Sequence, residues 1–230
     1  MEEDDESWLH GFIDNETMQP CSHETMIISL QKVSKRYKYE WIFRGIDFQF
    51  EQGRSYAVTG PNGSGKSTLL KVLSGHLSPS KGKIIFASDG AAIGADDVYK
   101  SVSYAAPYID LIEEFTLSEA IDFHQQFKPF LEGLHPKDLL GLLSFSNAKD
   151  KQVRHFSSGM KQRLKLVLAL CSASPLLLLD EPTTNLDRQG MDWYRNLVER
   201  FAKGRTIVVA SNVDVDFDFC DERVDILDYK

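Results

Sequence analysis

The spacing of apolar and polar residues along the chain predicts strands that alternate with helices. Short apolar or alternating runs bounded by polar, Gly or Pro residues are typical of strands, and apolar residues that recur every three or four positions are typical of helices. On this basis we expect strands at residues 26–30, 45–50, 54–59, 83–86, 102–105, 176–179, 206–210 and 224–227. We expect helices over 66–73, over 118–143 with interruptions at Pro129 and Pro136, over 160–171 and over 191–201.

The order of these elements predicts an α/β fold. In the last third of the chain strands alternate with helices, which indicates a mainly parallel sheet. The early strands are interpreted as an added antiparallel β subdomain, and the helices over about 107–155 as an added helical subdomain. We therefore predict an acidic, flexible extension over residues 1–25 and one folded domain over residues 26–230.

Charge sets the amino-terminal segment apart from the rest. The 230 residues include 26 Lys and Arg against 34 Asp and Glu, a formal net charge of −8. Residues 1–25 hold eight of the acidic residues and no Lys or Arg, so residues 26–230 carry 26 of each sign. No global positive field exists to attract DNA or RNA, and nucleic-acid binding is not expected.

Membrane and secretory signals are missing from the sequence. No apolar run approaches the roughly 20 residues that cross a bilayer, and the acidic start lacks the positive region of a secretory signal. Three widely separated cysteines, Cys21, Cys171 and Cys220, form no CxxC pair. This usage predicts a reducing compartment without a disulfide framework or structural zinc, so we expect a cytoplasmic protein.

A glycine-rich segment between a predicted strand and a predicted helix carries the clearest chemistry. Glycines let backbone N–H groups approach phosphates closely, and the helix that follows directs its positive end at the same anion. We expect Lys66 to reach the β- and γ-phosphates of a nucleotide and the Ser67 hydroxyl to hold Mg²⁺. The segment matches GxxxxGK[ST], the Walker A pattern, and reads Gly60-Pro61-Asn62-Gly63-Ser64-Gly65-Lys66-Ser67, with Thr68 next.

A second segment supplies carboxylates suited to phosphoryl transfer. The four leucines of 176–179 predict a buried strand, and Asp180 and Glu181 follow it directly. Asp180 would complete the Mg²⁺ shell, and Glu181 would act as a general base on the attacking water. Apolar strands that end in Asp-Glu are common. This pair indicates a phosphoryl-transfer site only because the same chain also contains the glycine-rich loop.

A third segment identifies a family. The run Phe156-Ser157-Ser158-Gly159-Met160-Lys161-Gln162-Arg163, between the other two motifs, resembles the signature sequence of ATP-binding cassette (ABC) ATPases. Taken alone, Ser-Ser-Gly before a helix is only a helix N-cap. The resemblance covers roughly residues 26–228 and implies a P-loop NTPase core.

The resemblance implies roles for further residues. In the family the signature closes over ATP held by a partner subunit, so Ser157, Ser158, Gly159 and Met160 imply a homodimer or pseudo-symmetric dimer. Asp187 matches the family residue that couples the two sites. Tyr37 matches the aromatic that stacks on adenine, with an ordinary strand tyrosine as the alternative and Tyr39 and Trp41 as rivals.

Two residues depart from the family pattern. The family has a Gln that contacts Mg²⁺ where this chain has Pro107, which offers no side-chain amide. It also has a His that contacts the γ-phosphate where this chain has Asn212. Asn can donate a hydrogen bond but carries no proton at neutral pH. Since one lost transition-state contact can cost 10²–10³ in rate, we predict slow hydrolysis.

The resemblance implies an Mg²⁺-dependent ATPase subunit of an ABC transporter. It would work as a dimer with a separate transmembrane permease subunit, peripheral on the inner face of the membrane. One alternative is a soluble single-cassette ABC ATPase that takes no part in transport. Another is an ATP-binding dimerisation switch with very slow hydrolysis, which the Pro107 and Asn212 departures favour and the intact Asp180-Glu181 pair opposes.

Overall fold

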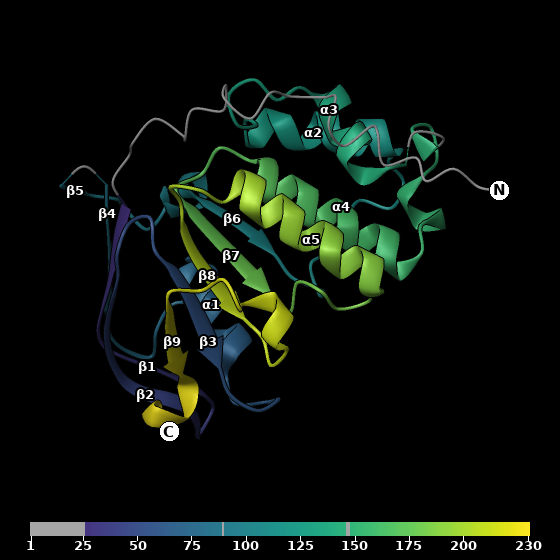
Figure 1. Ribbon diagram of the computed structural model, residues 1–230. Coiled ribbons are helices and arrows are strands. Elements are labelled where there is room, and N and C mark those ends of the chain that lie inside the picture. The colour runs from purple at the N-terminus through teal and green to yellow at the C-terminus, as the bar shows by residue number, and fades with distance from the viewer. Residues whose placement is uncertain (1–25, 89, 146–147) are drawn as a thin grey trace.

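A parallel sheet at the centre of the fold carries the carboxyl ends of its five strands to one edge. The structure is a computed structural model that describes residues 26–88, 90–145 and 148–230, so the predicted 1–25 extension lies outside the described residues. The parallel sheet has five strands in the order β6 (Val102–Ala105), β7 (Leu176–Asp180), β8 (Thr206–Ala210), β3 (Ser55–Thr59) and β9 (Glu222–Asp225) (Figure 1).

The central strands β7 and β8 are buried along their whole length and mostly apolar, because both faces of the parallel sheet are covered. Leu177 and Leu179 of β7 pack into one core with helices α4 (Ser158–Cys171) and α5 (Arg188–Phe201). Leu176 and Leu178 point the other way, into a second core with α1 (Lys66–Leu73) and the antiparallel strands. The run of four leucines therefore supplies two cores at once, as side chains of a strand alternate between faces.

The second sheet is antiparallel, as the sequence predicted for the early strands. Its four strands lie in the order β2 (Glu40–Phe50), β1 (Met26–Tyr37), β4 (Lys81–Ser88) and β5 (Ala91–Ala92). Strands β1 and β2 are longer than predicted because register shifts between Leu30 and Arg36 break the alternation of apolar residues. Where β1 pairs with β4, a register shift between Gln31 and Ser34 forms a β-bulge opposite Gly82. The two backbones approach closely there, since a Cβ on Gly82 would lie 2.3 Å from the Lys32 carbonyl oxygen.

The helical stretch predicted over 118–143 is two helices. Helix α2 (Leu117–Phe127) begins with a capping box, in which the Glu119 N–H donates to Thr116 Oγ1 and the Thr116 N–H donates to Glu119 Oε2 at 2.8 Å. Lys128 ends it before Pro129, and α3 (Pro136–Leu143) starts with proline in its first turn. Both helices pack on α4 and α5 at one end of the molecule (Figure 1).

One predicted strand is placed wrongly. We expected residues 224–227, whereas β9 occupies Glu222–Asp225 and a 3₁₀ turn, η5 (Ile226–Tyr229), follows. The cause is local, since Asp225 Oδ1 accepts a hydrogen bond from the Leu227 N–H at 2.9 Å and turns the chain. Ile226 remains fully buried, so its apolar character reflects packing and not strand pairing.

The opposite, amino-terminal edge of the parallel sheet is held by a buried arginine. Arg205, directly before β8, is 2% exposed. Its guanidinium donates to the carbonyl oxygens of Ser174 at 2.7 Å and Leu170 at 2.8 Å. It thereby joins the carboxyl end of α4 to the starts of β7 and β8.

Two expectations from the sequence concern membrane-spanning helices and the cysteines. Within residues 26–88, 90–145 and 148–230, no helix has both the length and the apolar composition needed to span a bilayer. Cys171 and Cys220 are free thiols, and Cys21 lies outside the described residues.

Candidate functional site

The candidate site lies at the carboxyl edge of the parallel sheet, where the motifs predicted from the sequence meet. Strand β3 leads into the glycine-rich loop 60–67, β7 ends at Asp180, and β8 leads to Asn212. Since parallel strands end at the same edge, segments far apart in the chain become neighbours there. Hydrogen bonds confirm this arrangement for Ser67 with Asp180 and for Asn62 with Asn212.

The glycine-rich loop wraps around the end of α1 with its lysine folded inward. Lys66 is 5% exposed, and its ammonium donates to the carbonyl oxygens of Gly60 at 2.7 Å and Pro61 at 3.3 Å. Gly60 has φ +140°, and a Cβ there would lie 2.7 Å from Ile226 Cγ2. The Ser64 hydroxyl is buried without a hydrogen-bond partner among the described residues. A buried cation and an orphaned hydroxyl fit a loop that receives phosphate oxygens.

Ser67 and Asp180 form the pair suited to Mg²⁺. The Ser67 hydroxyl donates to Asp180 Oδ1 at 3.1 Å, and Asp180 is 1% exposed. Burial raises the pKa of Asp180, and hydrogen bonds from Tyr108 and Ser67 oppose that rise. Mg²⁺ prefers a few protein oxygens completed by phosphates and water, so one carboxylate and one hydroxyl beside a phosphate loop fit this ion.

Glu181 occupies a restrained position next to Asp180. Its φ is +44°, a left-handed conformation that is uncommon for a non-glycine residue. Its N–H donates to the Ala210 carbonyl oxygen at 2.8 Å, which continues the pairing of β7 with β8 and holds the strained backbone. Burial lowers the pKa of Lys66, while the charges of Glu181 and Asp180 oppose that change. The side chains of Lys66, Asp180 and Glu181 therefore share one electrostatic site.

Asn212 reaches the glycine-rich loop directly. Its amide Nδ2 donates to Asn62 Oδ1 at 2.8 Å, although 150 residues separate the two. The neighbouring Ser211 hydroxyl donates to the buried carboxylate of Asp216, which fixes the turn after β8. Asn212 therefore lies beside the glycine-rich loop.

The segment that resembles the signature begins α4 on the molecular surface. Ser157 is the N-cap, and its hydroxyl accepts a hydrogen bond from the Met160 N–H at 3.2 Å. Ser157 and Ser158 are both exposed, and a Cβ on Gly159 would lie 3.0 Å from the Asn185 carbonyl oxygen. The backbone of Gly159 is thus packed against the segment that leads to Asp187.

Asp187 begins α5 as its N-cap. Its Oδ1 accepts from the Gly190 N–H at 2.8 Å and lies 4.0 Å from the Arg163 guanidinium. Gln162, which we did not select as a site residue, donates from Nε2 to the Pro182 carbonyl oxygen at 2.8 Å and is buried. It ties the signature helix to the segment directly after Glu181.

Tyr37 is the last residue of β1. Its side chain is 47% exposed, and the Lys35 ammonium lies 5.6 Å from its ring centroid. The adjoining strand β2 reaches the glycine-rich loop, since a Cβ on Gly65 would lie 2.5 Å from Ile42 Cγ2. Trp41, one of its rivals, is flanked by the cations of Arg36, Arg44 and Lys81.

Two tyrosines that sequence reasoning missed contact the Asp180 carboxylate. The Tyr108 hydroxyl donates to Asp180 Oδ2 at 2.8 Å. The Tyr104 hydroxyl lies 3.4 Å from the same oxygen and donates to the Tyr108 hydroxyl, whose own proton is directed at Asp180. Burial raises the pKa of both phenols, so both stay protonated donors. Their sequence signal is weak, since Tyr108 merely follows Pro107 and lies 72 residues from Asp180.

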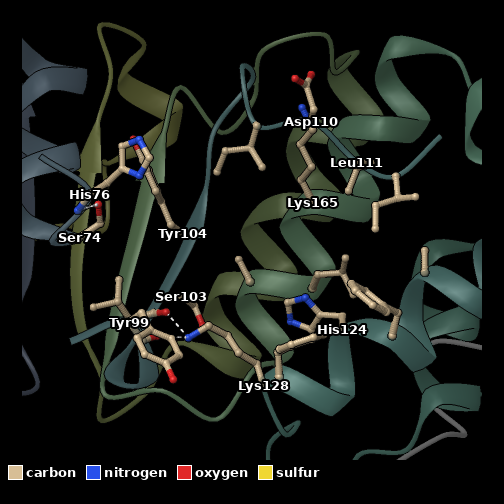
Figure 2. Close-up of a pocket in the computed structure, with 18 of the residues that line it drawn as sticks. Ser74, His76, Tyr99, Ser103, Tyr104, Asp110, Leu111, His124, Lys128 and Lys165 are labelled. Carbon is tan, nitrogen blue, oxygen red and sulfur yellow. Dashed lines mark hydrogen bonds between the residues drawn. The ribbon is translucent and has the colours of Figure 1, made fainter. Parts of the chain in front are cut away.

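A cleft of about 710 Å³ opens beside these tyrosines. It lies between β6 and α2, and Figure 2 shows Tyr104 on one side and His124 on the other, with Lys128 reaching toward Tyr99. Most of its remaining walls are apolar, and they include Phe123 and Phe127, which are 38% and 67% exposed. The cleft therefore joins the two tyrosines that contact Asp180 to an exposed apolar surface.

Comparisons with known proteins agree with one another. The family model described as "ABC transporter" matches residues 43–184. The chain is 33% identical over 193 residues to the lantibiotic transport ATP-binding protein SrtF of Streptococcus pyogenes, which covers 81% of this chain and 80% of that protein. It is 33% identical to the Nod factor export ATP-binding protein I of Burkholderia lata over 80% of this chain and 62% of that protein.

Solved structures give the same result for the fold. An ATP-binding subunit of an ABC transporter superposes with a TM-score of 0.73 at 26% identity, over 86% of this chain and 85% of that one. An ATP-binding cassette solved as a dimer in a post-hydrolysis state, with ADP and Pi bound, has a TM-score of 0.74 at 22% identity over 86% of this chain and 93% of that one. The latter likeness concerns the fold alone.

Proposed function

This chain belongs to the ABC transporter family as an ATP-binding ATPase subunit, and from that premise we propose how its residues bind and hydrolyse ATP. The observation that carries the proposal is the hydrogen bond between Ser67 and Asp180, which joins the phosphate loop to the end of β7. It brings a phosphate cradle, a metal carboxylate and a candidate base to one edge of the sheet.

The roles follow from the chemistry of each group. The loop 60–67, with Thr68, binds the phosphates of ATP, and Lys66 offsets their charge at the β- and γ-positions. Ser67 and Asp180 hold Mg²⁺, which when bound offsets charge that develops on the phosphates. Glu181 accepts a proton from the attacking water as its oxygen bonds to the γ-phosphorus. Tyr37 stacks on the adenine ring.

Turnover is slow in this proposal. Asn212 donates a hydrogen bond toward the phosphate loop but cannot carry a proton, and Pro107 has no polar side chain to offer. Losing one such contact costs about 2.7–4 kcal/mol of transition-state stabilisation. Glu181 retains the general-base step, so hydrolysis is slow and not absent. If hydrolysis were slower still, the protein would act as the ATP-binding dimerisation switch, the second alternative given above.

The active form is a dimer. Ser157, Ser158, Gly159 and Met160 are directed at ATP bound by a second cassette, and Asp187 lies between the two sites. The exposure of Ser157 and Ser158 supports this role, because neither side chain is covered by the rest of its own subunit. The partner is a second copy or a related cassette.

A separate membrane-spanning subunit docks at the cleft beside Tyr104 and α2. The exposed apolar side chains of Phe123, Phe127 and Ile112, the last 41% exposed, support this position. The chain would then lie on the cytoplasmic face of a membrane, held there by its partner. Helices α2 and α3 belong to the proposed helical subdomain over about 107–155. Their movement would couple the partner bound at the cleft to the ATP site.

Hydrolysis by the purified protein tests the proposal. We expect phosphate release from ATP that requires Mg²⁺ and that is lost in Lys66→Ala, which lacks the cation that binds phosphate. Glu181→Gln should keep ATP binding and lose turnover by about 10²–10³. The matched control is Glu199→Gln, an exposed carboxylate on α5 that should retain wild-type turnover.

Two outcomes would contradict the proposal. Equal turnover in Glu181→Gln and wild type would remove Glu181 from the chemistry, and turnover at ordinary family rates would remove the argument from Asn212. Isolation of the native protein from detergent-solubilised membranes tests the transporter assignment. A stoichiometric multi-span partner supports it, whereas a purely soluble complex favours an ABC ATPase that takes no part in transport.

A further inference from the structure

The carboxylate of Asp180 has a separate hydrogen-bond donor for each oxygen. Ser67 donates to Oδ1 at 3.1 Å, and Tyr108 donates to Oδ2 at 2.8 Å. The Tyr104 hydroxyl lies farther from Oδ2, at 3.4 Å, and donates to the Tyr108 hydroxyl. Because the carboxylate is 1% exposed, these hydroxyls take the place of solvent and define its orientation.

The backbone before Tyr108 is held in place independently of its hydroxyl. Strand β6 ends at Ala105, and the Ile109 N–H donates to the Ala106 carbonyl oxygen at 3.2 Å and closes a turn. The Lys165 ammonium, from α4, donates to the Pro107 carbonyl oxygen at 2.6 Å. The backbone at Tyr108 is therefore fixed relative to the edge of the sheet.

The ring of Tyr108 is held as well. The Lys71 ammonium of α1 lies 4.0 Å from its centroid, and the ring of Tyr104 packs against it edge-on at 6.4 Å. These contacts involve the ring and not the hydroxyl, so a phenylalanine at position 108 would keep them. The contribution of the hydroxyl can thus be separated from that of the ring.

We propose that Tyr108 is a positioning residue for Asp180, in place of the side-chain amide that Pro107 lacks. Its hydroxyl holds Oδ2, so that Oδ1 stays directed at Ser67 when Mg²⁺ and nucleotide bind. This inference rests on the proposed ATP site, and it adds a residue that the three motifs do not contain. Tyr108 also lines the cleft, so the orientation of the Asp180 carboxylate would depend on a side chain of the cleft wall.

The test is nucleotide affinity with and without the metal. Tyr108→Phe is titrated with a fluorescent, non-hydrolysable ATP analogue, once in Mg²⁺ and once in EDTA. We expect the Kd in EDTA to stay within about twofold of wild type, and the Kd in Mg²⁺ to rise roughly tenfold, as the loss of a hydrogen bond to a charged group predicts. Mn²⁺ with the same analogue, followed by electron paramagnetic resonance, should show the same loss.

Tyr104→Phe is the matched control, since it removes the more distant hydroxyl of the pair and should weaken Mg²⁺-dependent binding less than Tyr108→Phe does. Thermal unfolding of each variant without metal reports on folding. Equal losses in Mg²⁺ and EDTA would mean a structural role alone, and no change in either, or tighter binding in Mg²⁺, would also overturn the inference. If wild-type protein fails to bind the analogue, the proposed ATP site fails instead.

Discussion

At the residue scale, the site divides into side chains that short motifs reveal and side chains that only the fold brings in. Lys66, Ser67, Asp180 and Glu181 could be selected from the sequence, because each motif is contiguous and its chemistry is local. Their roles remain predictions, although Ser67 and Asp180 do meet. Tyr108 could not be selected, since its contact depends on the pairing of β6 with β7.

The hydrogen bond between Asn212 and Asn62 leads to a prediction about rate. Asn212→His restores a side chain that can both donate a hydrogen bond and carry a proton beside the phosphate loop. We expect kcat for ATP to rise by about 10–100-fold, measured as phosphate release at saturating Mg²⁺ and ATP. The comparison variant is Asn212→Ala, which also loses the bond to Asn62. If alanine raises kcat as much as histidine, release of Asn62 is the cause and the proton argument is wrong.

At the scale of elements, the accuracy of prediction follows how local the determinants are. Strands 102–105 and 206–210 and the helix over 66–73 form over the predicted residues, because each is a short apolar or amphipathic run between clear breaks. The β-bulges of β1 and the turn at Asp225 depend on contacts across the sheet and on a side-chain cap. Neither feature produces a regular spacing of apolar residues, so the sequence did not predict these boundaries.

The junction between α2 and α4 predicts a pH dependence of stability. His124 Nε2 hydrogen-bonds the Ser172 hydroxyl at 2.8 Å, and its ring stacks on Phe130. Burial, with a smaller effect of the Lys128 charge, lowers the pKa of His124 to about 4. An unfolded histidine titrates near 6.5. Between about pH 6.5 and 4 the unfolded chain therefore takes up a proton that the folded chain refuses, and the free energy of unfolding falls as pH drops, by about 2 kcal/mol.

Urea denaturation at pH 7.0, 5.5 and 4.5 measures this loss. We expect His124→Gln to unfold with a smaller dependence on pH over that range than wild type. His76→Gln, at an exposed position, should keep the wild-type dependence. An unchanged slope in His124→Gln would show that other groups control acid unfolding.

At the scale of the whole molecule, the fold was predictable and its internal connections were not. The α/β class, the parallel core and the antiparallel addition follow from the order of elements, whereas the division into an extension, a folded domain and a helical subdomain stays a prediction. The cleft beside Tyr104 had no counterpart in the sequence, because its walls come from the end of α1, from β6, from residues 108–115, and from α2 and α4. A surface built from several separate segments has no contiguous pattern.

The proposed dimer predicts that activity depends on protein concentration. One subunit supplies the phosphate loop and the other supplies Ser158, so the site is complete only in the associated form. We expect phosphate release per subunit to rise with total protein concentration before it reaches a plateau. Ser158→Lys should remove the rise by placing bulk and charge in the interface, whereas Gln125→Lys, exposed on α2, should preserve it. A constant specific activity down to nanomolar protein would argue for a complete site within one chain.

The buried Arg205 has a consequence for substitutions at the candidate site. It holds the amino edge of the sheet through carbonyl oxygens, while all of the proposed chemistry lies at the carboxyl edge of the same strands. Most of its partners are backbone carbonyls, which are present whatever side chains surround them, and the Ser174 hydroxyl is a side-chain partner. Substitutions at the carboxyl edge, such as those proposed at Asn212 and Glu181, are therefore expected to leave this anchor unchanged.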